Sequence, residues 1–233
     1  MHDERHLAHD RRALLKNSAV LAAALVIPSA VAASTRRLTQ QDLAPLHEPP
    51  VPVMPVRQAV TSPRVVHPDL LRQALASLDR HKARVARRDK IAIADMNAPS
   101  SQPRFHIVDL RTGASTSFLV AHGSGSDPAH TGFLKRFSND FGSNATSEGA
   151  FVTADYYVGK HGSSQRLVGL DASNCNAFDR NIVVHSAWYA NRGMLATHGM
   201  LGRSQGCFAV GEGELDKVFA MLGTGRMIFS AKV

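Results

Sequence analysis

A cysteine that closely follows a serine and directly follows a glycine is the residue of this chain best suited to covalent chemistry. Cys207 ends the stretch Ser204-Gln-Gly-Cys and precedes a short apolar run. The thiolate form of cysteine is a nucleophile, and a neighbouring imidazole can take up its proton. Gly206 lets a substrate carbonyl approach the backbone, whose N–H groups can hold a developing oxyanion. The stretch therefore predicts nucleophilic catalysis by Cys207.

Two histidines compete as the base that would activate this thiol. His185 ends the apolar segment Ile182-Val-Val-His, 22 residues before Cys207, whereas His198 lies nine residues before it in a predicted loop. A strand end holds a side chain firmly, which favours His185. Spacing along the chain leaves both open, because a nucleophile and its base meet in space rather than in sequence.

A disulfide and a zinc site are the alternatives for the same residues. Cys175 and Cys207 are the only cysteines, and in an oxidising compartment two cysteines can pair. The candidate zinc ligands are His122, His161, His185, His198 and Cys207. The sequence has no His-Glu-x-x-His and no Cys-x-x-Cys spacing. We therefore expect no metal and no other cofactor.

The first 32 residues have the pattern of an export signal. The paired arginines Arg11 and Arg12 precede an apolar stretch over 19–27 and the small-residue site Ala30-Val-Ala32. The pattern predicts a twin-arginine-like or general secretory signal, with the mature protein in the periplasm or cell envelope. The apolar stretch is too short to span a bilayer, so no stable membrane span is expected after cleavage.

Composition sets the class of the rest of the chain and of its partners. Hydrophobic residues make up 44% and charged residues 20%, which is typical of a globular protein. The net charge of +8 comes from scattered basic residues without interleaved aromatics, so we expect no nucleic-acid partner. A basic surface suits an acidic polymer such as a bacterial cell wall. Residues 33–66 are rich in proline and predict an extended linker.

Residues 67–233 predict a mainly β domain that must position these groups. A helix is expected from His67-Pro68, with Leu71, Leu75 and Leu78 at helical spacing. Another helix is expected over 212–221. The predicted strands are 90–94, 104–110, 117–120, 149–158, 166–170, 181–185, 207–210 and 226–230. The result is a β domain with one preceding helix and one C-terminal helix.

These residues together resemble a known family. His185-Ser186 followed by Ser204-Gln-Gly-Cys207 is similar to the catalytic motif of the L,D-transpeptidases with YkuD-type domains, and most closely to the murein L,D-transpeptidase catalytic-domain branch. The likeness extends over about 67–233, with matching stretches that include 104–110, 120–127, 159–162 and 182–185. Gln205 stands where most of the family has histidine. The resemblance implies an L,D-transpeptidase-like β-sandwich.

The resemblance also implies a reaction and roles for its residues. Cys207 would attack the carbonyl at position three of a peptidoglycan tetrapeptide stem, with His185 as base. A backbone carbonyl near Ser186 would orient the imidazole, and the N–H groups of Gly206 and Cys207 would hold the oxyanion. The residues expected to contact the stem peptide are Arg203, Ser204, Tyr157, Trp188 and His198. Two other functions stay open: a cell-wall thiol peptidase or amidase that uses water, and a non-catalytic wall-binding module.

Overall fold

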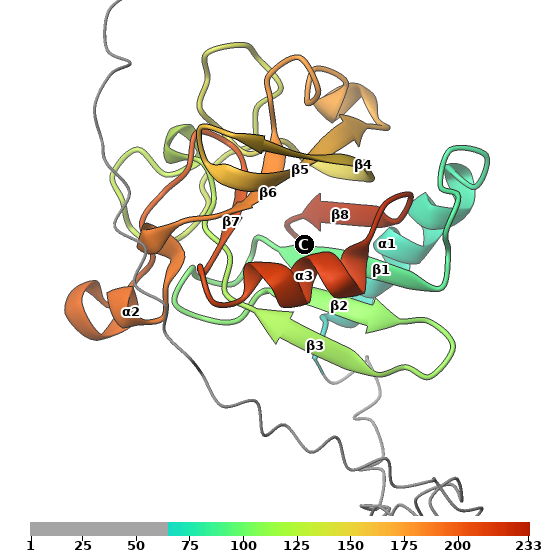
Figure 1. Ribbon diagram of the computed structural model, residues 1–233, viewed down its shortest axis with the longest axis horizontal. Helices are drawn as coiled ribbons and strands as arrows, with labels where there is room; N and C mark the ends of the chain where they lie inside the picture. The colour runs from blue at the N-terminus through green and yellow to red at the C-terminus, as the bar shows by residue number, and fades with distance from the viewer. Residues whose placement is uncertain (1–64) are drawn as a thin grey trace, which may run out of the picture. The chain divides into compact units, whose positions relative to one another are not determined.

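The computed structural model describes residues 65–233. The predicted export segment 1–32 and all but the last two residues of the predicted linker 33–66 lie outside this range. In the described part, the elements are eight strands, three α-helices and short 3-10 turns (Figure 1). The expected fold class, mainly β with a preceding and a C-terminal helix, is confirmed. No helix of residues 65–233 is long and apolar enough to cross a membrane.

Helix α1 (Pro68–Arg80) begins where the sequence predicts. His67 caps it, because its Nδ1 accepts a hydrogen bond from the Asp69 backbone N–H, and Pro68 occupies the first turn, where no N–H is needed. Of the predicted apolar positions, Leu78 is buried and Leu71 packs partly buried against the same cluster, whereas Leu75 is 40% exposed. The buried face consists of Leu70, Ala74, Ser77 and Leu78. Val66, the last residue of the predicted linker, is 1% exposed and packs in the same cluster.

All eight strands belong to one hydrogen-bonded sheet with the order β3-β2-β1-β8-β4-β5-β6-β7. The strands of one half are β1 (Lys90–Asp95), β2 (Phe105–Asp109), β3 (Ser115–Phe118) and β8 (Met227–Ala231). Those of the other half are β4 (Gly149–Gly159), β5 (Gly162–Gly169), β6 (Val183–Ser186) and β7 (Phe208–Val210). Two neighbouring pairs, β1 with β8 and β6 with β7, are parallel. The C-terminal strand β8 thus joins the two halves.

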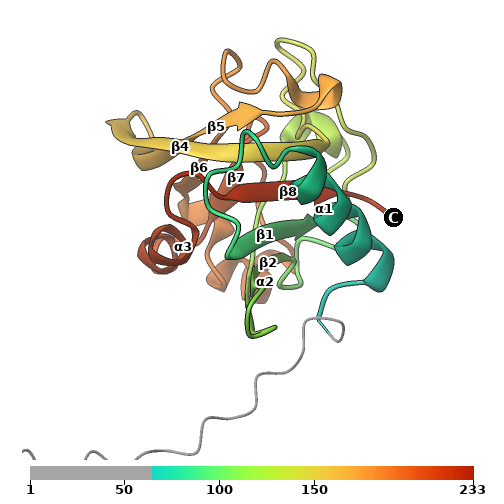
Figure 2. The same cartoon turned by 90° about the vertical axis from the view of Figure 1, so that its right-hand side faces the viewer.

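Side chains from the same face of both halves of the sheet pack together, which gives the sandwich-like core. One apolar cluster contains residues from all eight strands and from α3 (Leu215–Leu222). Phe208 of β7 contacts Phe105 of β2 and Phe151 of β4, with ring centroids 6.2 and 5.5 Å apart. On the opposite face of β1 and β8, α1 covers a second cluster (Figure 2). The halves of the sheet are therefore held by side chains as well as by strand pairing.

A short helix appears where a loop was expected. Helix α2 (Gly193–His198) lies in the long connection between β6 and β7, and His198 is its last residue. None of its residues is buried. The helix was not predicted because a single turn and a half with no buried side chain leaves little periodic signal in a sequence.

Candidate active site

Strands β6 and β7 place His185 and Cys207 on the same side of the sheet. The strands are parallel, with His185 beside Ala209, and Cys207 lies two residues before Ala209. Phe208 points into the core, so the side chains before and after it point to the other face. Strand spacing puts the Cα atoms of His185 and Cys207 about 8 Å apart. Side chains on the same face at this separation can meet.

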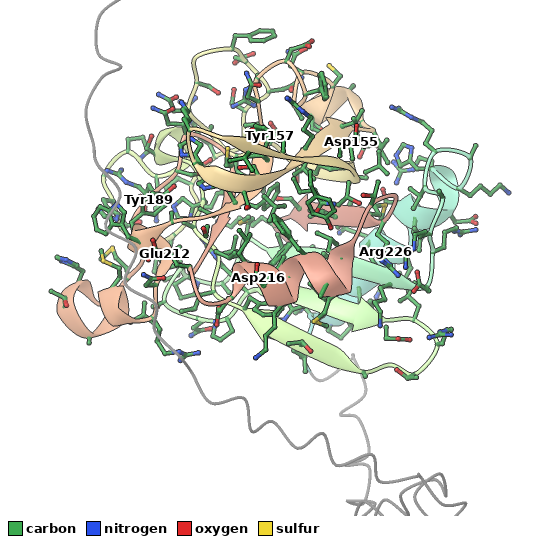
Figure 3. The ribbon with its side chains drawn as sticks, in the orientation of Figure 1. Asp155, Tyr157, Tyr189, Glu212, Asp216 and Arg226 are labelled. Atoms are coloured by element: carbon green, nitrogen blue, oxygen red, sulfur yellow. The ribbon has the colours of Figure 1, made fainter. Side chains whose placement is uncertain are left out.

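Both side chains line one cavity of about 810 Å³. Tyr157 from β4 and Tyr189 from the segment after β6 contribute to its wall, and both are labelled in Figure 3. The lining residues are Phe141, Gly142, Asn144, Tyr157, Lys160, His161, Arg180, Asn181, His185, Tyr189, Arg203, Ser204, Gln205 and Cys207.

His185 is held as a neutral base. Its side chain is 1% exposed, and Nδ1 lies 2.8 Å from the Ser186 carbonyl oxygen. Since a carbonyl only accepts, Nδ1 carries the proton and Nε2 is left as the acceptor. Burial lowers the pKa of His185, although its bond to the Ser186 carbonyl opposes that effect. The imidazole therefore stays neutral at pH 7 and can take up a proton.

Cys207 is held as a protonated thiol. It is 7% exposed, and its Sγ donates to the Asn181 carbonyl over 3.5 Å. Burial raises its pKa; the backbone N–H of Val183 and the charges of Lys160 and Arg180 act in the opposite direction. Forming the thiolate thus requires a base. The other cysteine, Cys175, is exposed, and both thiols are free.

The turn before Cys207 corrects two of the expected roles. The Ser204 hydroxyl donates to the Cys207 carbonyl (2.7 Å) and accepts from the Gly206 N–H (3.1 Å). Both groups are therefore used inside the turn, although Ser204 also lines the cavity. The structure does not support Gly206 as an oxyanion donor or the Ser204 hydroxyl as a free substrate ligand. The backbone N–H of Cys207 is left as the candidate oxyanion donor.

A buried polar network around His122 is hydrogen-bonded to the turn that contains Ser204. The Ser204 N–H donates to the His122 carbonyl, and the Ser124 N–H donates to the Ser204 carbonyl. The His122 ring lies 2.7 Å from the Arg104 guanidinium through Nδ1 and 3.5 Å from Asp127 through Nε2. His122 is thus a structural residue and not part of the cavity wall.

The cavity has a positive lining. Lys160, Arg180 and Arg203 face it, and among its described lining residues none is Asp or Glu. Arg203 is oriented by bonds from Nη1 to the carbonyls of Asp127 and Pro128. A cationic wall without carboxylates favours an anionic ligand.

Sequence reasoning missed Arg180. Its guanidinium holds the segment 138–147, part of which lines the cavity. Its Nη1 donates to the Ser138 carbonyl and the Ser147 hydroxyl, and its Nη2 donates to the Ser143 hydroxyl and the Ala145 carbonyl. A lone arginine before a strand has no distinctive local pattern. Lys160 also lines the cavity, although the sequence marked it only as part of the family-like stretch 159–162, and so does His161, which the sequence offered as a structural, substrate-lining or zinc-binding residue.

Two expected contact residues lie away from the cavity. Trp188 is 66% exposed and packs edge-on against Tyr189, with ring centroids 5.9 Å apart. His198 is exposed at the end of α2. Neither is among the lining residues, whereas Tyr157 and Arg203 are. Of the two candidate bases, His185 is therefore the one that shares a cavity with Cys207.

The histidines and cysteines do not assemble a metal site in the described part of the chain. No group of three His, Cys, Asp or Glu side chains among residues 65–233 is arranged to hold a metal ion. The zinc ligands considered from the sequence are divided between this cavity, the network below it and α2.

A family model described as the L,D-transpeptidase catalytic domain matches residues 63–230. The chain belongs to this family. No curated protein matches the sequence.

Solved structures of L,D-transpeptidases are similar in fold. One from Mycobacterium smegmatis is 13% identical, with 61% of this chain and 58% of that chain covered and a TM-score of 0.38. L,D-transpeptidase 3 from Mycobacterium tuberculosis, in complex with a faropenem-derived adduct, is 13% identical over 61% and 60%, with a TM-score of 0.39. One from Xylanimonas cellulosilytica is 15% identical over 68% and 69%, with a TM-score of 0.36. This chain spans less than two thirds of the length of the two mycobacterial structures.

Proposed function

We propose that this protein is an exported cysteine L,D-transpeptidase that acts on peptidoglycan tetrapeptide stems. The observation that carries the proposal is the placement of His185 on β6 and of Cys207 immediately before the parallel neighbour β7, with both residues lining one cavity. Membership of the L,D-transpeptidase catalytic-domain family supports the same reaction class.

The proposed reaction has two halves. The Cys207 thiol gives its proton to Nε2 of His185, and the sulfur attacks the carbonyl carbon at the third position of the stem. The Cys207 N–H donates to the oxyanion. When the tetrahedral intermediate collapses, the C–N bond breaks and the leaving D-amino acid takes the proton from His185. An acceptor amine then attacks the thioester, which forms a new amide and restores the thiol.

The charge of the cavity suits this substrate. A tetrapeptide stem carries free carboxylates, and Lys160, Arg180 and Arg203 offer three cations around the sulfur's cavity. Arg203 is our candidate for holding a stem carboxylate, since a guanidinium can form paired bonds to one. Tyr157 is our candidate for packing against the stem backbone.

The test uses the full chain, the C207A variant and the matched C175A variant. With a disaccharide-tetrapeptide, the unaltered chain and C175A should release the terminal D-amino acid and gain the mass of a thioester, whereas C207A should do neither. Release by C207A would contradict the proposal.

The acceptor separates the remaining alternatives. When a second stem is supplied as the amine, cross-linked dimers support a transpeptidase, whereas shortened stems alone support a wall peptidase. Binding to sacculi without any thioester on the unaltered chain would support a non-catalytic module.

Export belongs to the same proposal, because peptidoglycan stems lie outside the cytoplasmic membrane. The segment 1–32 that would direct it lies outside the described residues. N-terminal sequencing of protein recovered from the periplasm is expected to begin at Ala33. Recovery of the full-length chain only from the cytoplasm would contradict export.

A further inference from the structure

The hairpin between β4 and β5 carries a second histidine to the cavity. Gly159 and Gly162 are the last paired residues of the two strands, and Lys160 and His161 form the two-residue tip between them. Gly162, which follows the tip, has a φ of +73°, a left-handed conformation that glycine accepts at low cost. Both tip residues line the cavity.

At this tip, the His161 ring stacks on the ring of His185. The ring centroids are 4.5 Å apart, and the planes differ by 23°. The bond from Nδ1 to the Ser186 carbonyl holds one edge of the His185 ring against rotation about the Cβ–Cγ bond. The stacked ring covers a face and restricts this rotation. Together the two contacts determine where Nε2 lies.

We propose that His161 is a positioning residue for the transfer reaction, and that its ring holds the His185 imidazole so that Nε2 faces the Cys207 proton. This inference rests on the proposed function. His161 forms no bond with the substrate in this role. It acts through the face of its ring.

Contacts of the Tyr157 side chain with Gly159 and Arg166 hold the hairpin that carries the His161 ring. The Tyr157 side chain lies against the backbone of Gly159, where an added Cβ would be 2.7 Å from the Tyr157 ring. On the same ring, the Arg166 guanidinium lies 4.2 Å from the centroid. This stack of glycine, tyrosine and arginine links the tip to the body of β5.

The charges around His185 favour two neutral rings. Lys160 faces both histidines from the tip, and Arg180 and Arg203 face the cavity from its other walls, beside the Cys207 thiol and the Tyr157 and Tyr189 hydroxyls. Burial lowers the pKa of both His161 and His185, and Lys160 lowers both further. His161 also lowers the pKa of His185, because two stacked imidazolium ions repel.

Removing the stacked ring should therefore change both rate and pH dependence. In H161A, the His185 ring becomes more exposed to solvent and no longer has a neighbouring imidazole that can become charged. The pKa of His185 should therefore rise. The acidic limb of the kcat/KM profile should move to higher pH. Because the base is also misplaced, kcat should fall roughly tenfold to a hundredfold. KM should change little, since no substrate contact is removed.

The variant H161F tests the ring separately from its nitrogens. Phenylalanine can keep the stack without a charge, so H161F should retain kcat within about threefold of the unaltered chain. The matched control is H198A, which removes an exposed histidine outside the cavity and should leave kcat and the pH profile unchanged. All three variants are assayed as full chains with the tetrapeptide donor.

Two results would overturn the inference. One is an H161A variant with unaltered kcat and an unaltered acidic limb. The other is an equal loss in H161F and H161A, which would mean that the nitrogens of His161, and not its stacked ring, are needed.

A second measurement keeps this test independent of the transpeptidase assay. The titration of the His185 ring by proton NMR should show a higher pKa in H161A than in the unaltered chain. If no variant and not even the unaltered chain forms a thioester, the proposed function fails, while the NMR shift still decides whether His161 controls His185. No shift in H161A would contradict the electrostatic part of the inference.

Discussion

The Ser204 side chain has a structural role in the turn that presents Cys207. Its hydroxyl satisfies the Cys207 carbonyl and the Gly206 N–H at once, in a turn where Ser204, Gly206 and Cys207 are buried and Gln205 is exposed. A buried backbone group without a partner costs about 1–3 kcal/mol. The turn that presents the cysteine therefore depends on this hydroxyl.

The S204A variant should lose stability for that reason. We expect the free energy of unfolding to fall by about 1–3 kcal/mol, measured by urea denaturation. The matched control is S163A, an exposed serine on β5, which should change stability by less than about 0.5 kcal/mol. Equal stability of S204A and S163A would show that the turn does not need the hydroxyl.

The directions of the pKa shifts of Cys207 and His185 indicate that the proton moves between them during the reaction and that they do not form an ion pair beforehand. Burial raises the pKa of the Cys207 thiol and lowers the pKa of the His185 imidazole. Both groups are thus neutral before reaction. The thiolate and the imidazolium that form during the reaction must therefore be stabilised by the bound substrate and by the cationic side chains that line the cavity.

At the scale of elements, the turn from Arg203 to Cys207 requires glycine at one position. Gly206 has a φ of +114°, and an added Cβ would lie 2.7 Å from the Ala145 carbonyl oxygen and 2.8 Å from Ile182. A side chain here would strain the backbone and push the turn away from two neighbouring segments. The small residue before the cysteine is thus a packing requirement as well as a means of access.

The G206A variant should be destabilised by more than about 1–3 kcal/mol, since a strained backbone and a steric clash add. Gly213, which precedes α3, is the matched control because an added Cβ there would meet nothing within 4 Å. The melting temperature of G213A should stay close to that of the unaltered chain. A G206A variant with the same melting temperature as G213A would contradict this account of the turn.

At the scale of the whole molecule, several buried histidines link folding to pH. Burial lowers the pKa of His106 and His185, and it lowers the pKa of His122 to about 4 with help from the Arg104 charge. Below pH 6.5 the unfolded chain binds protons that the folded chain does not. Their contribution to stability is therefore complete above pH 6.5 and is lost as the pH falls toward 4.

We therefore expect the urea midpoint to fall between pH 7 and pH 5. Each such group contributes up to about 1.4 kcal/mol per pH unit within its window. The H122N variant should show a flatter dependence, although the loss of the Arg104 contact lowers its stability at pH 7. H198N removes an exposed histidine and should keep the unaltered slope. A midpoint that does not change between pH 7 and pH 5 would contradict the prediction.

Local patterns predicted most of the elements, for reasons that are visible in particular residues. The strands alternate or form short apolar runs because they are buried on one or both faces, and Pro68 marks the start of α1 because the first turn needs no N–H. The face of α1 was predicted in part: Leu78 is buried and Leu71 packs against the cluster, but Leu75 is exposed although it is as apolar as the residues that are buried. Helix α2 went unseen because none of its side chains is buried.

Residue types and their order were enough to select Cys207 and to prefer His185, because a thiol after a glycine and an imidazole at a strand end are local features. The tertiary arrangement decided the rest. It placed the His161 hairpin tip over His185, brought Arg180 and Lys160 to the cavity that holds the sulfur, and left Trp188 and His198 outside that cavity. Those relations join residues that are far apart in the chain, and a distance across a sheet depends on register and twist, which no single segment encodes.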